Sequence, residues 1–180
     1  MLSYKLEICG LTRELPVVEV SSGVSIASFV ILGDTELVTQ VAPELVRKMP
    51  EVEALICAEA KGIPLVFEIS RLLGMNYVVA RKNVKPYMND PLVEEVDSIT
   101  SQKRQVLVLD GVDVAKIRGK GVAIIDDVVS TGSSVAAVEK LVQKAGGTVA
   151  AKVAILAEGD AARRQDLIFL QELPLFSSDC

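Results

Sequence analysis

The chain has 180 residues, enough for one domain with a sizeable core, so we expect a single domain over residues 1–180. A formal net charge of −5 and only 4% aromatic residues argue against nucleic acid as the main ligand. The chain has no histidine, which excludes histidine-based catalysis and histidine metal sites. No apolar run approaches the ~18 residues of a membrane span, so no membrane association is expected.

Cysteine usage and the N-terminus indicate a cytoplasmic protein. Cys9, Cys57 and Cys180 are odd in number and scattered, without zinc-site spacing. The first residues lack the apolar stretch of a signal peptide. A reduced compartment therefore fits best.

The first half of the chain predicts a hairpin followed by alternating helices and strands. Strands are expected over residues 6–9, 15–20, 54–57 and 77–80, and helices over 34–48 and 63–73. The hairpin turn is expected about residues 10–13. Asp34 or Thr35 would cap the first helix, Pro43 would kink or split it, and Gly74 would end the second helix.

The second half continues this alternation. Two alternating runs, 93–100 and 104–109, predict a hairpin, followed by a strand over 122–125, a helix over 135–144 and a strand over 149–156. Strands that alternate with helices predict an α/β fold with a doubly wound, mainly parallel sheet.

The run 121–134, GVAIIDDVVSTGSS, is the most informative segment. Asp126 and Asp127 end its apolar strand, where open parallel sheets place their ligands, and ionised carboxylates accept hydrogen bonds from vicinal sugar hydroxyls. Small residues then lead into a helix, whose free N–H groups suit a phosphate. These residues are Ser130, Thr131, Gly132, Ser133 and Ser134. The run therefore predicts a site for a sugar phosphate.

Two further segments add positive charge. A glycine-containing loop, Ala58-Glu59-Ala60-Lys61-Gly62, follows the strand 54–57. Arg81 and Lys82 follow the strand 77–80, with Lys85 close behind. Because the chain is acidic overall, a polyanionic substrate needs such a local basic patch.

The acid pair with its T-G-x-[ST] loop resembles the signature of type I phosphoribosyltransferases, and the A-K-G loop is similar to the diphosphate loop of the adenine enzymes. The resemblance implies that Asp126 and Asp127 bind the ribose hydroxyls and that Ser130 to Ser134 bind the 5′-phosphate of phosphoribosyl diphosphate. It assigns the diphosphate to Ala60, Lys61, Gly62, Arg81, Lys82 and Lys85. The catalytic set would be Arg81, Lys82, Lys85 and Asp127.

The same resemblance implies the remaining parts of the molecule. Mg²⁺ would arrive with the substrate, without direct protein ligands, and Asp126 and Asp127 would hold it through water. Residues 83–109 would form a flexible hairpin lid, residues 1–33 an N-terminal hood that binds the base, and two chains a homodimer. In the hood, Phe29 would stack on the purine, and Glu158 would accept a hydrogen bond from an exocyclic amine.

The base is expected to be adenine, as in purine salvage. Hypoxanthine–guanine enzymes carry an aspartate where this chain has Ser130, and xanthine enzymes carry a lysine near Glu158. The adenine enzymes place a glutamate in the flexible loop, where this chain reads Asp97-Ser98-Ile99-Thr100. Two alternatives therefore stay open: a xanthine-type enzyme, and a non-enzymatic regulator that senses phosphoribosyl diphosphate.

Overall fold

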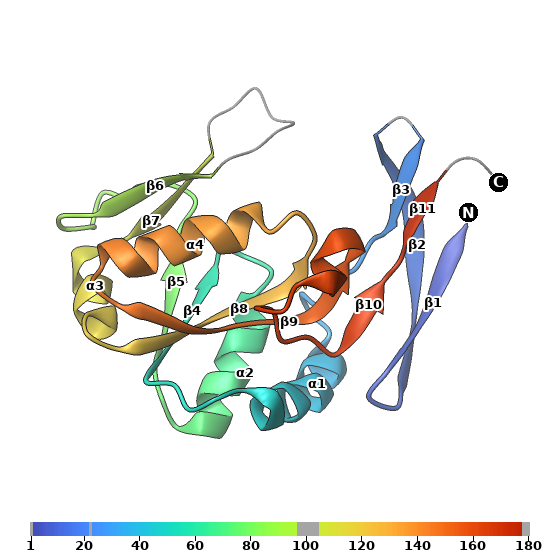
Figure 1. The fold of residues 1–180 in the computed structure, drawn as a ribbon, viewed down its shortest axis with the longest axis horizontal. Coiled ribbons are helices and arrows are strands. Elements are labelled where there is room, and N and C mark those ends of the chain that lie inside the picture. Colours follow the sequence, from blue (N-terminus) through green and yellow to red (C-terminus); the bar gives the residue numbers. More distant parts are fainter. Residues whose placement is uncertain (1, 22, 97–104, 178–180) are drawn as a thin grey trace.

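A five-stranded parallel sheet forms the centre of the molecule (Figure 1), as the sequence predicts. The computed structural model describes residues 2–21, 23–96 and 105–177. The strand order is β10-β9-β8-β4-β5. The strands are β4 (Ala54–Ala58), β5 (Tyr77–Ala80), β8 (Gly121–Val129), β9 (Thr148–Glu158) and β10 (Gln171–Leu173).

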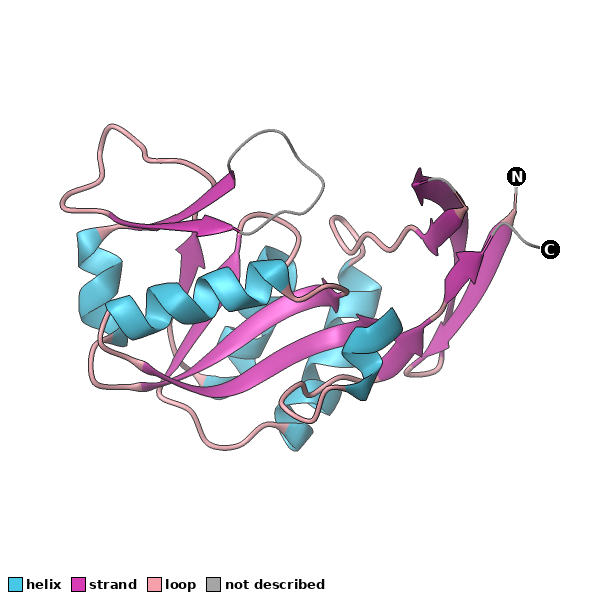
Figure 2. Ribbon diagram, turned by 45° about the horizontal axis from the view of Figure 1, so that its top comes forward, coloured by secondary structure: helices cyan, strands magenta, loops and turns pink. Residues whose placement is uncertain are grey.

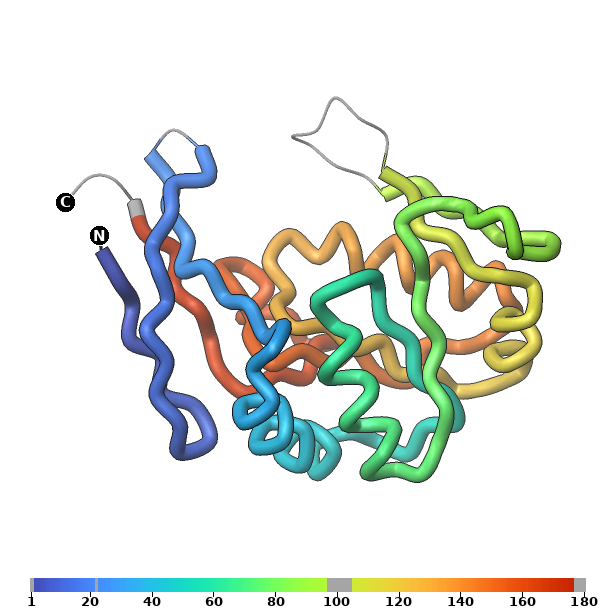
Figure 3. The backbone as a smooth tube through the Cα atoms, turned by 180° about the vertical axis from the view of Figure 1, so that it is seen from behind, coloured from blue at the N-terminus to red at the C-terminus, as the bar shows by residue number. Residues whose placement is uncertain are grey.

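Helices cover both faces of this sheet (Figure 2). They are α1 (Thr35–Lys48), α2 (Ile63–Leu73), α3 (Gly111–Ile117) and α4 (Ser133–Lys144). Alternate residues of β4 enter two separate cores, because successive side chains of a strand point to opposite faces. Leu55 and Cys57 pack with α1 and α2, whereas Ala54 and Ile56 pack with α3 and α4. The view from behind shows α1 and α2 on the side of the sheet opposite α4 (Figure 3).

The helix boundaries follow local capping chemistry. The Asp34 carboxylate accepts the Leu37 N–H at 3.1 Å and so caps α1. Gly74 ends α2 in the left-handed region at φ +65°, which favours glycine. Pro43 lies inside α1 without splitting it, which corrects one alternative expected there.

A second, four-stranded antiparallel sheet flanks the parallel one, in the order β1-β2-β3-β11. Its strands are β1 (Ser3–Ile8), β2 (Leu11–Ser21), β3 (Val24–Ala27) and β11 (Leu175–Ser177). The expected turn about residues 10–13 is wrong: Ile8 already pairs with Leu11, and the turn is Cys9–Gly10, both with positive φ. Since β11 pairs with β3, residues from both ends of the chain build this sheet, which we call the hood sheet.

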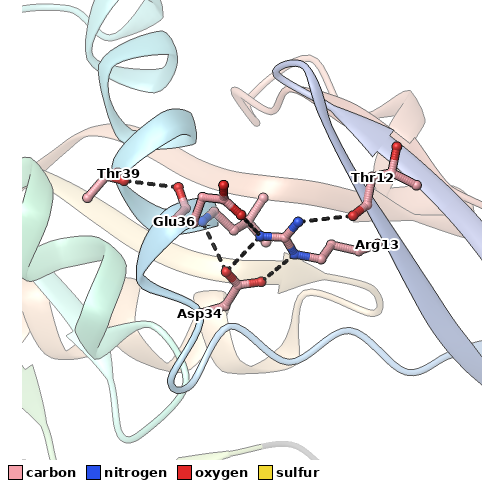
Figure 4. A network of polar contacts seen from close by, with 6 residues as sticks. Thr12, Arg13, Asp34, Glu36 and Thr39 are labelled. Atoms are coloured by element: carbon pink, nitrogen blue, oxygen red, sulfur yellow. Dashed lines mark hydrogen bonds and ion pairs between the residues drawn. The ribbon is translucent and has the colours of Figure 1, made fainter.

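Arg13 joins the hood sheet to the main body (Figure 4). Its Nε donates to Asp34 Oδ2 at 2.7 Å, and its Nη2 donates to Asp34 Oδ1 at 3.0 Å and to Glu36 Oε2 at 2.8 Å. The guanidinium holds the pKa of Asp34 below its usual range. The residue that caps α1 therefore also fixes the hairpin β1–β2.

A two-stranded sheet, β6 (Leu92–Val96) and β7 (Gln105–Leu109), stands beside the main one. Its arms confirm the predicted hairpin, and a bridge from Val108 to Arg81 attaches it next to β5. The expected strand ends at 97–100 and 104 lie outside the described residues. Within the described ranges, no helix is long and apolar enough to cross a membrane.

Candidate active site

The two carboxylates lie where β8 extends beyond the end of its neighbour β4. Strand β8 continues to Val129, beyond the predicted end at Ile125, because β9 keeps pairing with it. On the other edge, β4 pairs with β8 only as far as Ile125. The edge of β8 beside Asp126 and Asp127 is therefore no longer covered by β4, at the carboxyl end of the sheet.

The acid pair includes a buried carboxylate oxygen that has no hydrogen-bond donor. Burial and the neighbouring Asp127 charge raise the pKa of Asp126 above its usual range. Asp127 is 4% exposed, and its Oδ2 accepts no hydrogen bond within the described part of the chain. The Lys61 ammonium lies 4.0 Å from that oxygen. A buried acceptor left in this state favours a ligand that brings donors or a cation.

The loop after β4 brings Lys61 to the acids. A Cβ at Gly62 would lie 3.2 Å from both the Ile125 carbonyl oxygen and the Cys57 Cβ, so a side chain here would require the loop to shift by a few tenths of an ångström away from β8. The Glu59–Ala60 peptide in this loop is cis. The Lys61 ammonium also donates to the Phe29 carbonyl oxygen at 3.4 Å.

A cavity of about 530 Å³ opens over these groups. We call it the main cavity. It is lined by Ala58, Glu59, Ala60, Lys61, Lys82, Val96, Gln105, Val106, Leu107, Asp126, Asp127, Val128 and Ser134. Acidic groups of β8, basic groups of two loops and the arms of the hairpin thus meet in one place, as the sequence predicts.

Three of the predicted diphosphate ligands, Gly62, Arg81 and Lys85, do not line the main cavity. Arg81 lines a neighbouring cavity with Tyr87 and Asp110, and its Nε lies 3.4 Å from Glu59 Oε2. The Lys82 N–H donates to the same oxygen at 2.9 Å, and these partners hold the pKa of Glu59 below its usual range. Arg81 pairs with the loop carboxylate and does not line the main cavity, and its assignment to the diphosphate stays a prediction. Lys85 does not line the main cavity and contributes weakly to the same shift.

The loop of small residues stands at the start of α4. The helix begins at Ser133, two residues earlier than predicted, and Gly132 precedes it in the left-handed region at φ +80°. The hydroxyls of Thr131 and Ser133 lie 3.0 Å apart. Thr131, Gly132 and Ser133 line a smaller cavity of about 240 Å³ next to the main one, which we call the loop cavity.

Arg164 lines the loop cavity too, and the sequence reasoning did not find it. It lies some 30 residues beyond the loop and follows the short 3₁₀ helix Gly159–Arg163, so no local motif connects it with residues 130–134. A basic residue in a polar segment gives no signal of its own.

The two predicted base ligands lie apart from the main cavity. Phe29 is 4% exposed and packs in the core on the α1 side, so its ring has no free face to stack on a purine; this corrects its assignment. Glu158 is 6% exposed, ends β9 and pairs with Leu173 of β10. It is a buried acceptor beside the start of the loop 130–134, because Val129 pairs with the preceding Ala157, but it does not line the main cavity.

Sequence comparison matches residues 36–173 to the model of the phosphoribosyl transferase domain family. The chain belongs to this family. Among its relatives, a hypoxanthine/guanine phosphoribosyltransferase of Methanococcus voltae is 34% identical over 136 residues, covering 75% of this chain and 69% of the relative. The enzyme of that name from Ferroglobus placidus is 30% identical, covering 72% and 71%. The resemblance to type I phosphoribosyltransferases is confirmed.

Solved structures support the same fold. Adenine phosphoribosyltransferase of Saccharomyces cerevisiae superposes with a TM-score of 0.69 at 18% identity, covering 87% of this chain and 93% of that one. The enzyme from Giardia lamblia gives 0.65 at 17% identity, with coverages of 95% and 93%. At this level of identity the likeness establishes the fold alone.

The donor set suits a metal ion that arrives with its own ligands. Carboxylate oxygens are the protein ligands that Mg²⁺ prefers, and Asp127 Oδ2 is an unsatisfied one. Among the described residues, no group of three or more acidic or cysteine side chains is placed to hold a metal. Asp126 and Asp127 would therefore hold Mg²⁺ through water, as part of a site that needs further ligands from a bound molecule.

Proposed function

We propose that the protein is a purine phosphoribosyltransferase, which transfers the 5-phosphoribosyl group of phosphoribosyl diphosphate to a purine base. The observation that carries this proposal is the meeting of the Asp126–Asp127 pair, Lys61 and the start of α4 around one cavity. Membership of the phosphoribosyl transferase family and relatives named for purine bases support it.

Each part of the site has one task in this reaction. Asp127 Oδ2 and the Asp126 carboxyl accept hydrogen bonds from the ribose hydroxyls, and the loop 130–134 binds the 5′-phosphate through N–H and hydroxyl groups. Lys61 and Lys82 face the diphosphate in the main cavity. Mg²⁺, when bound with the substrate, neutralises part of the diphosphate charge.

The chemical step needs positioning and charge stabilisation more than covalent help. A ring nitrogen of the base bonds to C1 of the ribose while the C1–O bond breaks, and its electron pair leaves with the diphosphate. The proton on that nitrogen passes to solvent or to a diphosphate oxygen. Lys61 and Lys82 stabilise the charge that develops on the leaving group, with Arg81 keeping Glu59 in place beside them.

Adenine is the base we propose, with Glu158 as the acceptor of its exocyclic amine; because Glu158 is buried and does not line the main cavity, this contact requires the base to reach beyond the lining of that cavity. A buried carboxylate accepts a hydrogen bond from an exocyclic amine, which adenine and guanine carry and hypoxanthine and xanthine lack. Guanine, with hypoxanthine, is the second candidate, because the relatives named above are hypoxanthine/guanine enzymes. Ser130 alone is therefore too weak a reason to separate the chain from that group.

Turnover with each purine tests the base assignment. The protein, Mg²⁺ and phosphoribosyl diphosphate are mixed with adenine, guanine, hypoxanthine or xanthine, and nucleotide formation is measured. Glu158→Gln should cost the preferred amine-bearing base about tenfold or more in kcat/KM, since a charge-assisted hydrogen bond is lost. Equal loss for all four bases would refute a contact between Glu158 and the amine.

Homodimer formation, by analogy with the family, and a cytoplasmic location, on the cysteine pattern and the N-terminal sequence, complete the proposal. A regulator that only senses phosphoribosyl diphosphate would bind the sugar without turning over any purine, so the same assay separates it from the enzyme.

A further inference from the structure

Arg164 belongs to an ion-pair chain that links the segment after the 3₁₀ helix to β9 and α4. Its Nε and Nη2 donate to the two oxygens of Asp166 at 2.9 and 2.8 Å. Lys152 of β9 donates to Asp166 Oδ2 at 2.8 Å and lies 2.8 Å from Glu139 Oε2 of α4. The Lys152 side chain is only 12% exposed. A two-bond clamp of this kind fixes both the position and the plane of a guanidinium.

The remaining nitrogen of that guanidinium faces the loop at the start of α4. A Cβ built on Gly132 would lie 2.5 Å from Arg164 Nη1. No side chain fits at position 132 while Arg164 keeps this pose, so the glycine serves both the left-handed turn and the approach of the arginine. Within the described ranges, Nη1 has no hydrogen-bond partner, whereas Nε and Nη2 are both engaged.

The surroundings of Nη1 suit a phosphate. The loop cavity brings Arg164 together with Thr131, Gly132 and Ser133; its lining also holds the Glu95 carboxylate and Lys140, whose ammonium lies 3.5 Å from Glu94. The N-terminus of α4 contributes its dipole at the same place. Hydroxyls, a helix start and a clamped guanidinium converge there, and a planar guanidinium binds phosphate oxygens with defined geometry.

We propose that Arg164 binds the 5′-phosphate of the substrate, and that Asp166 and Lys152 are its positioning residues. The proposal rests on the proposed function and adds a phosphate ligand from outside the loop 130–134. Arg164 donates through Nη1 to a phosphate oxygen while Asp166 keeps the other two nitrogens occupied.

Arg163 provides a matched control. It is the neighbouring arginine, with the same charge, but its side chain is 87% exposed and its partner Asp160 is 97% exposed. We expect Arg164→Gln to raise the KM for phosphoribosyl diphosphate about tenfold or more, with kcat nearly unchanged, because a charge-assisted contact to a non-reacting group is lost. Arg163→Gln should leave both constants unchanged. Equal constants for Arg164→Gln and the wild type would overturn the proposal.

Calorimetric binding separates this proposal from the function on which it rests. The wild type should bind ribose 5-phosphate and inorganic diphosphate, and Arg164→Gln should lose affinity for the first only. If the wild type binds neither these probes nor phosphoribosyl diphosphate, the proposed function fails. If it binds ribose 5-phosphate and Arg164→Gln binds it equally well, Arg164 is not a phosphate ligand.

Asp166→Asn and Arg164→Lys keep the test decisive should Arg164→Gln fold poorly. Asp166→Asn retains the arginine but weakens its clamp, so KM should rise less than in Arg164→Gln while the thermal midpoint stays measurable. Arg164→Lys keeps a charge without the planar fork and should recover part of the lost affinity. Wild-type affinity for ribose 5-phosphate in Asp166→Asn would contradict the positioning role.

Discussion

At the scale of single residues, the paired carboxylates of the site lower the stability of the folded protein when no ligand is bound. Asp126 is half-buried beside another carboxylate, and desolvation and that neighbouring charge raise its pKa in the folded protein. The folded state therefore binds the Asp126 proton more tightly than the unfolded chain, so the contribution of Asp126 to stability is most favourable at acid pH. It falls as the pH rises from the ordinary carboxyl range toward the raised pKa.

Replacing this carboxyl should stabilise the empty protein. Asp126→Asn keeps the oxygen that accepts the Asp127 N–H at 2.9 Å but cannot ionise. We expect the thermal midpoint of the variant to exceed that of the wild type at pH 8, and the difference to shrink at pH 4. Thermal unfolding followed by circular dichroism at both pH values measures this. An equal rise in the thermal midpoint at pH 8 and pH 4 would contradict a destabilising effect of the ionised Asp126 carboxylate.

Asp127 should matter for binding rather than for folding. Its Oδ2 has no donor in the described structure and lies 4.0 Å from Lys61, so it is free to accept a ribose hydroxyl. Asp127→Asn should weaken phosphoribosyl diphosphate binding by about 10- to 100-fold, the cost of about 1.5–3 kcal/mol for a hydrogen bond to a charged group. Isothermal titration calorimetry gives the affinity. Asp160→Asn, at an exposed carboxylate, is the control and should bind as the wild type.

At the scale of elements, the sequence predicted the helices and strands that have strong local signals, and it did not predict several short ones. Helix α2 and strand β5 have the bounds that the sequence predicts, because a glycine stop and apolar runs define them locally. Strands β3, β10 and β11 and helix α3 were not predicted, since only tertiary pairing defines such short pieces: β11 exists through β3, and β10 through β9.

The site divides in the same way. Asp126, Asp127, Lys61 and the loop 130–134 were found because each follows a strand or precedes a helix, where parallel folds place their ligands. Arg164 was missed because a clamp to Asp166, visible only in three dimensions, gives it its place. Phe29 was misassigned because a buried aromatic and a stacking aromatic have the same sequence pattern.

The junction between the hood sheet and α1 offers a test of element docking. Asp34→Ala removes the cap and the partner of Arg13, and should lower the free energy of unfolding by about 0.5–2 kcal/mol for the cap alone. Asp34→Asn retains a capping oxygen but loses the ionic pair, so its stability should lie between Asp34→Ala and the wild type. Urea unfolding at neutral pH measures the order. An Asn variant no more stable than the Ala variant would contradict the capping role.

At the scale of the whole molecule, the residues that stabilise the fold and the residues that would bind a ligand lie in different places. Two separate cores fix the parallel sheet, and the ligand groups gather at the carboxyl end of its strands. The hood sheet draws strands from both ends of the chain and is joined to the body through Arg13. The candidate ligand groups thus lie at the rim of this frame, where residues of the hairpin β6–β7 also line the main cavity.

The central claim is that this rim transfers a phosphoribosyl group to a purine. The most direct measurement combines the protein with Mg²⁺, phosphoribosyl diphosphate and each purine in turn, and quantifies both nucleotide and released diphosphate. We predict equimolar formation of the two products with at least one purine, adenine foremost, and a sharp loss of both in Asp127→Asn. Absence of turnover with every purine, or undiminished turnover in Asp127→Asn, would contradict the account.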